Sequence, residues 1–173
     1  KELRDQTDNI SEGNAEQICD VYPFQIAFNL IPQIDQFMEN SYTKEEWKLV
    51  QETRKILHSP DLLISATCVR VPVFISHSEA IHVELTHPMD PSEACEILES
   101  FEGVKVFSIS SSHPYPMPLD AVGEDDVLIG RLRKDVSSDS GLAMWVVSDN
   151  LMKGAALNAL QIYDELVQKE LIV

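Results

Sequence analysis

Several predicted strands follow one another along this 173-residue chain without a helix between each pair, and this order limits the possible folds. Purely parallel sheets are built from strands that alternate with helices, whereas mixed and antiparallel sheets do not need that alternation. The sequence therefore predicts an α+β fold with a mixed, largely antiparallel sheet and helices on one face.

The strand predictions depend on apolar segments that are bounded by proline, glycine and polar residues. Residues 62–71 form the clearest segment, and residues 80–85 show the alternation of a half-buried strand. These two strands are expected to be neighbours. Further strands are predicted over residues 22–30, 104–109, 126–133 and 142–148.

The helix predictions depend on signals at the helix ends. Thr43, followed three residues later by a glutamate, is a capping box that opens a helix over residues 44–57. Residues 91–101 form a second helix with proline in its first turn, and a final helix begins around Asn150. Three prolines stiffen the loop of residues 110–125, which is expected to lie over a surface.

The chain is strongly acidic, with 13 lysines and arginines against 29 aspartates and glutamates and a formal net charge of −16. This charge repels phosphate backbones and anionic membranes, so neither nucleic acid nor a membrane is an expected partner. The apolar runs are too short to span a bilayer. Three scattered cysteines form no disulfide framework or metal-site spacing, which favours the cytoplasm and a chain without a metal.

Arg70 is the first candidate site residue, because the period of two places it at the end of an apolar row with Ile64, Ala66 and Cys68. A guanidinium there is costly unless it meets an anion, and its planar fork suits a carboxylate. Two interpretations stay open, an internal salt bridge and a ligand carboxylate. Cys68 fits burial as a small hydrophobic residue better than a nucleophile.

His77 is a candidate acid/base, because it follows Arg70 by seven residues, beyond Pro72, where its side chain can turn toward the same pocket. An unperturbed imidazole has a pKa of about 6.5, which suits proton transfer. A structural or surface histidine is the commoner case. The other histidines are expected to face solvent and to have no catalytic role: His58, His82, His87 and His113.

Glu52 and Lys55 are three residues apart on the first predicted helix. An exposed ion pair at this spacing contributes only about 0.2–0.5 kcal/mol and is the ordinary interpretation. The functional alternative is that Glu52 receives an ammonium group and Lys55 a phosphate, as a zwitterionic phosphorylated substrate would require.

The final helix begins with Asp149 and Asn150 and continues with the small residues 154–156, which permit close packing. Either the sheet or a cofactor at the helix N-terminus can occupy that space. The chain has no glycine-rich phosphate loop and no hydrolase elbow motif, so it is not expected to contain a nucleotide fold.

Three segments that contain the candidate residues stand out when they are read together: Glu52-Thr-Arg-Lys55, Ala66-Thr-Cys-Val-Arg70-Val-Pro-Val and His77-Ser-Glu-Ala. In order and spacing they resemble the substrate-site segments of the aspartate-semialdehyde dehydrogenase family. Further similarity covers residues 26–32, 118–123, 130–135 and 149–158. The resemblance therefore extends over nearly the whole chain after residue 20.

The resemblance implies a role for each candidate residue: Arg70 for the substrate α-carboxylate, Glu52 for its ammonium group, Lys55 for phosphate, and His77 as the acid/base. Asn150 resembles a residue that contacts the nicotinamide cofactor. The implied reaction is the NADPH-dependent reductive dephosphorylation of β-aspartyl phosphate to aspartate β-semialdehyde, through an acyl thioester on cysteine. It belongs to the biosynthesis of lysine, threonine and methionine.

The resemblance also implies an organisation and a partner. Residues 1–20 would be a polar lead-in, residues 21–148 a substrate-binding and dimerisation domain, and residues 149–173 a helix that returns to a nucleotide domain. The fold would be like the C-terminal domain of glyceraldehyde-3-phosphate-dehydrogenase-like reductases, and the subunits would pair as a homodimer. The catalytic cysteine and most NADP contacts would come from an earlier segment, so this segment alone is expected to be inactive.

Two alternatives remain open from the sequence. One is a non-catalytic dimerisation or ligand-binding module of the same fold. The other is a related reductase acting on N-acetylglutamyl phosphate, for which Glu52 is the discriminator, because a free ammonium group needs an anion and an acetylated nitrogen does not.

Overall fold

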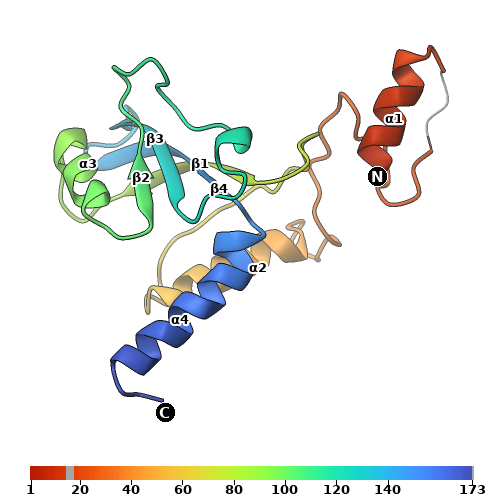
Figure 1. Cartoon of the computed structure of the whole chain (residues 1–173). Coiled ribbons are helices and arrows are strands. Elements are labelled where there is room, and N and C mark those ends of the chain that lie inside the picture. The colour runs from red at the N-terminus through yellow and green to blue at the C-terminus, as the bar shows by residue number, and fades with distance from the viewer. Residues whose placement is uncertain (15–17, 173) are drawn as a thin grey trace. The chain divides into compact units, whose positions relative to one another are not determined.

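The chain folds into two units, Lys1–Pro72 and Val73–Val173 (Figure 1). This computed structural model describes residues 1–14 and 18–172. No helix in the described part of the chain is both long and apolar enough to cross a membrane. Each unit has its own buried residues and is described separately below.

The first unit contains helices α1 (Glu2–Ser11) and α2 (Lys44–Ile56). Gln6 of α1 is 1% exposed, and its amide holds the chain that follows. Its Nε2 donates to the carbonyl oxygen of Ile18 at 2.8 Å, and its Oε1 accepts from the amides of Ile26 at 2.9 Å and Ala27 at 3.1 Å. Because both the NH2 group and the oxygen of this buried side chain form hydrogen bonds, Gln6 holds the irregular backbone that follows α1 in place without any sheet pairing.

The start of α2 confirms the predicted capping box. The Thr43 hydroxyl accepts from the Glu46 amide at 3.3 Å, and the Glu46 carboxylate accepts from the Thr43 amide at 2.7 Å. Two amides that the helix leaves without partners are thereby bonded. Arg54 and Lys55 lie in the last turn, where positive charge is favourable to the helix dipole.

The strands predicted over residues 22–30 and 62–71 are wrong. Residues 62–71 are extended, but their only ladder contact among the described residues is a single bridge between Arg70 and Ile31, at 2.8 and 3.0 Å. A period of two indicates an extended backbone, yet a strand also needs a partner in register. Here Pro32 cannot donate to a ladder, and Phe28, with a φ of 58°, turns the partner segment away.

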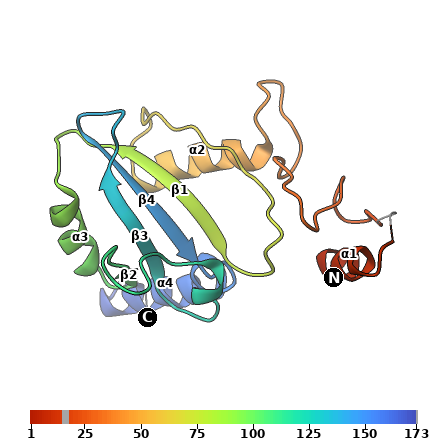
Figure 2. The ribbon, with the colours of Figure 1, turned by 90° about the horizontal axis from the view of Figure 1, so that it is seen from above.

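The second unit contains one sheet, in the order β1 (His77–Glu84), β4 (Gly141–Ser148), β3 (Val127–Lys134), β2 (Val104–Val106) (Figure 2). The β1–β4 and β3–β4 pairs are antiparallel and the β2–β3 pair is parallel. The predicted α+β class with a mixed, largely antiparallel sheet is confirmed. Helix α3 (Pro91–Glu99) packs against β2 and β3.

Most strand positions in this unit match the prediction, with one error of pairing. Predicted strands 80–85, 104–109, 126–133 and 142–148 correspond to β1, β2, β3 and β4. Strand β1 begins three residues earlier than predicted, at His77. Its sheet neighbour is β4 and not residues 62–71, because the latter form no strand.

The proline-rich loop of residues 110–125, which was expected to lie over a surface, contacts the sheet. The indole Nε1 of Trp145 donates to the carbonyl oxygen of Pro116 at 3.0 Å. The loop passes so close to β3 that a Cβ atom on Gly130 would lie 2.5 Å from Cδ of Pro116. The loop then forms a short 3-10 turn, η1 (Pro118–Asp120), and leads into the core residue Ala121.

The chain ends in a π-helical turn, η2 (Met152–Ala156), followed by helix α4 (Leu157–Gln168). The predicted final helix is therefore present, although its first turn is π-helical. No residue of α4 is buried. The core of this unit is formed instead by Ala121, Leu128 and Val147, with Phe107 and Trp145 packed against them.

Candidate functional site

Glu52 and Lys55 are exposed on the second half of α2. Among the described residues they form no ion pair with each other, whereas Glu45 and Lys48, at the same spacing on the same helix, lie 3.1 Å apart. The ordinary interpretation of an i,i+3 ion pair is therefore not the arrangement in this structure. Both charged groups are accessible to a ligand.

Arg70 is exposed, and its guanidinium lies over the ring of Tyr22, with Cζ 5.2 Å from the ring centre. Its backbone is fixed by the bridge to Ile31. Among the described residues no carboxylate forms an ion pair with Arg70, so the predicted alternative of an internal salt bridge is not observed. A guanidinium stacked on a ring keeps its N–H edges available for a bidentate carboxylate.

Glu46 joins the two parts of the first unit that carry these residues. It is 7% exposed, and its second carboxylate oxygen accepts from the Cys68 amide at 2.9 Å. The backbone hydrogen bonds from Thr43 and then Cys68 hold the pKa of this carboxyl below its usual value. Glu46 thereby attaches the segment of Arg70 to the helix of Glu52 and Lys55. The capping-box pattern identified Glu46 only as a helix cap.

His77 is the first residue of β1, in the second unit, and is paired across the sheet with Ser148 of β4. Its side chain is exposed, and its imidazole has no hydrogen-bond partner in the described part of the chain. Asn150 follows Ser148 by two residues, and its Oδ1 accepts from the Ser76 amide at 3.0 Å. The structure therefore brings His77 and Asn150 together at one end of the sheet.

Asp149 fixes the turn from which Asn150 extends. It is 4% exposed, and its two oxygens accept from the amides of Gly123 and Leu151, both at 2.8 Å. These hydrogen bonds hold the pKa of Asp149 below its usual value, and the bond from Gly123 has the largest effect. No sequence pattern indicates this role of Asp149, because Gly123 is 26 residues away in the chain.

The small residues 154–156 were expected to pack closely, but they are exposed. A Cβ atom added to Gly154 would have no heavy atom within 4 Å among the described residues. Of the two alternatives for this segment, close packing against the sheet is not observed in the described part of the chain. A small side chain here leaves room for a group outside this segment.

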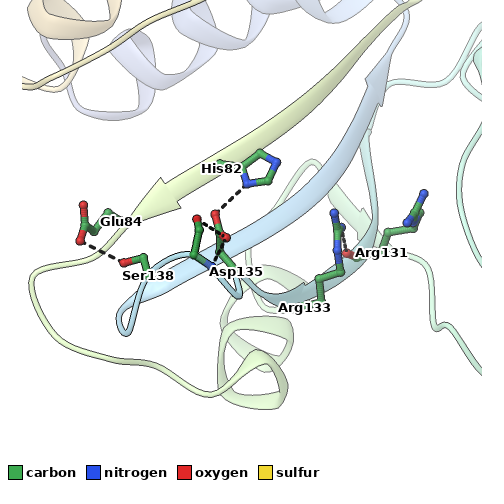
Figure 3. A network of polar contacts seen from close by, with 7 residues as sticks. His82, Glu84, Arg131, Arg133, Asp135 and Ser138 are labelled. Carbon is green, nitrogen blue, oxygen red and sulfur yellow. Dashed lines mark hydrogen bonds and ion pairs between the residues drawn. The ribbon is translucent and has the colours of Figure 1, made fainter.

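The opposite end of β1 carries a different polar network (Figure 3). Nδ1 of His82 lies 2.7 Å from Oδ2 of Asp135, and the Ser138 hydroxyl donates to Glu84 at 3.0 Å. The His82 and Ser137 hydrogen bonds hold the pKa of Asp135 well below its usual value. The His82 side chain is 59% exposed, so the prediction that it faces solvent is confirmed. Its contact with Asp135 joins β1 to the turn between β3 and β4.

Cys19, Cys68 and Cys95 form no disulfide in the described part of the chain. Burial raises the pKa of the Cys95 thiol. A thiol with a raised pKa is a poorer nucleophile, because the thiolate is the reactive form. No group of three or more His, Cys, Asp or Glu side chains in the described ranges has the geometry of a metal site.

A family model described as "Semialdehyde dehydrogenase, dimerisation domain" matches residues 1–153. The chain belongs to this family. Aspartate-semialdehyde dehydrogenase from Aquifex aeolicus is 48% identical over 172 residues, which is 99% of this chain and 51% of the relative. Aspartate-semialdehyde dehydrogenase from Bacillus subtilis is 45% identical over 181 residues, 99% of this chain and 52% of the relative.

Solved structures agree with the semialdehyde dehydrogenase family. Aspartate semialdehyde dehydrogenase II from Vibrio cholerae, complexed with ASA, superimposes with a TM-score of 0.91 at 48% identity, covering 96% of this chain and 49% of that one. A probable aspartate-semialdehyde dehydrogenase from Pseudomonas aeruginosa superimposes with a TM-score of 0.87 at 28% identity, covering 96% of this chain and 49% of that one. The chain spans about half the length of the relatives it matches.

Proposed function

We propose that this chain is the C-terminal portion of an aspartate-semialdehyde dehydrogenase, which reduces β-aspartyl phosphate to aspartate β-semialdehyde and releases phosphate. The observation that carries the proposal is the exposed Arg70 guanidinium, stacked on Tyr22 and without a carboxylate ion pair among the described residues. In a chain with a net charge of −16, such a cation is suited to an anionic substrate. The extent of similarity to named dehydrogenases supports the same assignment.

Each proposed substrate contact matches one charged group of the substrate. Arg70 binds the α-carboxylate through two parallel hydrogen bonds, Glu52 accepts from the ammonium group, and Lys55 attracts the phosphate. The absence of a Glu52–Lys55 ion pair in this structure supports these roles, because both exposed groups are then available to a ligand. Glu52 also favours this substrate over N-acetylglutamyl phosphate, whose nitrogen carries no charge.

His77 is the proposed acid/base. The imidazole is exposed at the start of a strand and has no hydrogen-bond partner among the described residues, so it can exchange a proton with a reacting group. We expect the nucleophilic cysteine to come from the other half of the enzyme. The role of His77 is then to take the proton from the thiol or return a proton to the oxygen that becomes the aldehyde.

The proposed cofactor is NADP, held mainly by the other half of the enzyme, where it supplies the hydride. The side-chain oxygen Oδ1 of Asn150 accepts a hydrogen bond from the Ser76 amide, while the side-chain NH2 group of Asn150 has no hydrogen-bond partner among the described residues. This donor fits the carbonyl oxygen of a nicotinamide carboxamide. The proposed location is the cytoplasm, whose reducing conditions suit a chain with no disulfide among its described residues.

The proposed assembly is a homodimer formed through this portion of the chain. Large apolar side chains such as Leu63 and Leu119 are 91% and 85% exposed, and a partner subunit is one means of covering them. The description of the matching family as a dimerisation domain supports this assembly. Sedimentation of the complete enzyme should show dimers, and a monomer at high concentration contradicts the proposal.

The decisive experiment measures the phosphate-dependent reduction of NADP by aspartate semialdehyde with the complete enzyme. We expect His77→Ala to lower kcat severely with a modest change in KM, and Arg70→Lys mainly to raise KM, because an ammonium group cannot form the bidentate contact. Normal turnover of His77→Ala removes the acid/base assignment. No turnover by the complete wild-type enzyme favours a non-catalytic module, and turnover only with N-acetylglutamate semialdehyde favours the related reductase.

A further inference from the structure

The residue before His77 has an unusual backbone conformation. Ser76 has a φ of 80°, in the left-handed region that residues other than glycine rarely adopt. Strand β1 begins at the next residue, so this turn sets the direction in which the chain enters the strand at His77. A turn of this kind persists only where its surroundings hold it in place.

The hydrogen bond that holds this turn comes from Asn150. Its Oδ1 accepts from the Ser76 amide at 3.0 Å, across 74 residues of sequence. The Ser76 hydroxyl is buried and has no partner in the described part of the chain. The side-chain contact available to fix Ser76 is therefore the Asn150 carbonyl oxygen.

Asn150 is itself firmly placed. The His77–Ser148 pair joins the start of β1 to the end of β4, and Asn150 lies two residues beyond that pair. Between them, the buried Asp149 carboxylate accepts two backbone hydrogen bonds at 2.8 Å, from Gly123 and Leu151. The Asn150 side chain thus extends from a rigid turn, and its position can define that of Ser76.

We propose that Asn150 is a positioning residue for His77. Its side-chain oxygen, Oδ1, holds the turn at Ser76, and this turn orients the His77 imidazole. This inference rests on the proposed function, in which His77 is the acid/base. The inference gives the Oδ1 atom and the NH2 group of the Asn150 side chain different roles. The carbonyl oxygen serves the proton-transfer group, and the NH2 group is left for the nicotinamide carboxamide, so one side chain connects cofactor and acid/base.

Two substitutions separate the two ends of the Asn150 side chain. Asn150→Asp keeps an oxygen that accepts from Ser76 but removes the NH2 donors, whereas Asn150→Ala removes both. The measurements on the complete enzyme are kcat at saturating NADP, the dissociation constant of NADP, and the imidazole NMR signals of His77 without cofactor. Those signals are identified by their absence from the spectrum of His77→Ala.

We expect Asn150→Ala to shift the His77 signals and to lower kcat by about 100-fold, since misplacement of about 1 Å can cost that much. Asn150→Asp should bind NADP more weakly, by about tenfold for one lost hydrogen bond, and keep more of kcat than Asn150→Ala. Ser76→Gly provides a rescue, because glycine adopts the left-handed region freely. Adding Ser76→Gly to Asn150→Ala should restore part of kcat.

The positioning role is overturned if Asn150→Ala changes NADP affinity but leaves the His77 signals and saturated kcat unchanged. It is also overturned if the Ser76→Gly and Asn150→Ala effects on kcat are simply additive. Neither result affects the acid/base assignment, which fails only if His77→Ala itself retains turnover. The rescue variant and the NMR signals keep the test decisive if Asn150→Ala is less stable.

Discussion

The guanidinium carbon of Arg70 lies 5.2 Å from the centre of the Tyr22 ring, although the two residues are 48 positions apart in the chain. Tyr22 is itself held by its backbone amide, which donates to the Glu2 carboxylate at 3.3 Å. A cation over an aromatic face is attracted to the ring, and its plane is thereby oriented. Tyr22 consequently presents the edge of the Arg70 fork to a ligand.

Replacing Tyr22 by leucine should raise KM for aspartate semialdehyde and change kcat little. The loss of an exposed cation–π contact, about 0.5–1 kcal/mol, corresponds to a two- to fivefold weaker interaction. Steady-state kinetics of the complete enzyme measure this effect. Tyr22→Phe is the matched control, because it keeps the ring, and an equal rise in KM for both variants would contradict the stacking argument.

Glu46→Gln should lower the free energy of unfolding near neutral pH and make that free energy less dependent on pH. The folded-state pKa of Glu46 is lowered by its backbone hydrogen bonds, so its contribution is present above the unfolded-state value and is lost as pH falls through the folded-state value. Urea unfolding at neutral and at acidic pH measures both changes. Glu45→Gln is the control, since Glu45 forms only a surface pair with Lys48, and an equal effect there refutes the role of Glu46.

Gly130→Ala should destabilise the second unit by about 1–3 kcal/mol, the usual cost of overpacking. The added Cβ atom would lie 2.5 Å from Cδ of Pro116 and 3.1 Å from Cα of Tyr115. Thermal unfolding measures the loss. Pro116→Ala removes the nearer atom, so the double variant should lose less stability than the sum of the single variants. Additive losses would show that this contact is not the cause.

Asp135→Asn should lower the thermal unfolding temperature and leave KM and kcat unchanged. The carboxylate accepts from His82 and from the amide and hydroxyl of Ser137, so its loss loosens the β3–β4 turn (Figure 3). The lowered pKa of Asp135 means that this contribution is lost as pH falls in the acid range. Ser138→Ala is a milder control, and a large change in kcat for Asp135→Asn would place this network in the catalytic machinery.

The parts of the fold that the sequence predicted well are those determined by local chemistry. The capping box at Thr43 and Glu46 involves residues three positions apart, and the structure confirms it. The strand predicted over residues 62–71 failed because pairing depends on a distant partner, and the segment near Ile31 offers only one residue in register. Extended conformation is local, whereas membership of a sheet is not.

The candidate site shows the same division. The residue types at Arg70, Glu52, Lys55 and His77 were identifiable from pattern and resemblance, and their roles stay predictions. The contacts that hold them are not predictable from the sequence, because each contact joins distant parts of the chain. Tyr22 reaches Arg70, and Asn150 reaches Ser76 across 74 residues.

The two bonds of the Glu46 carboxylate also imply an order of events in folding. The bond to Thr43 closes three residues, whereas the bond to Cys68 closes 22, at a greater cost in loop entropy. We expect the helix to form first with one carboxylate oxygen already engaged, and the segment that carries Arg70 to attach afterwards. The proposed substrate-binding group of Arg70, Glu52 and Lys55 would then be completed late, when Arg70 is attached to the helix that already carries the other two.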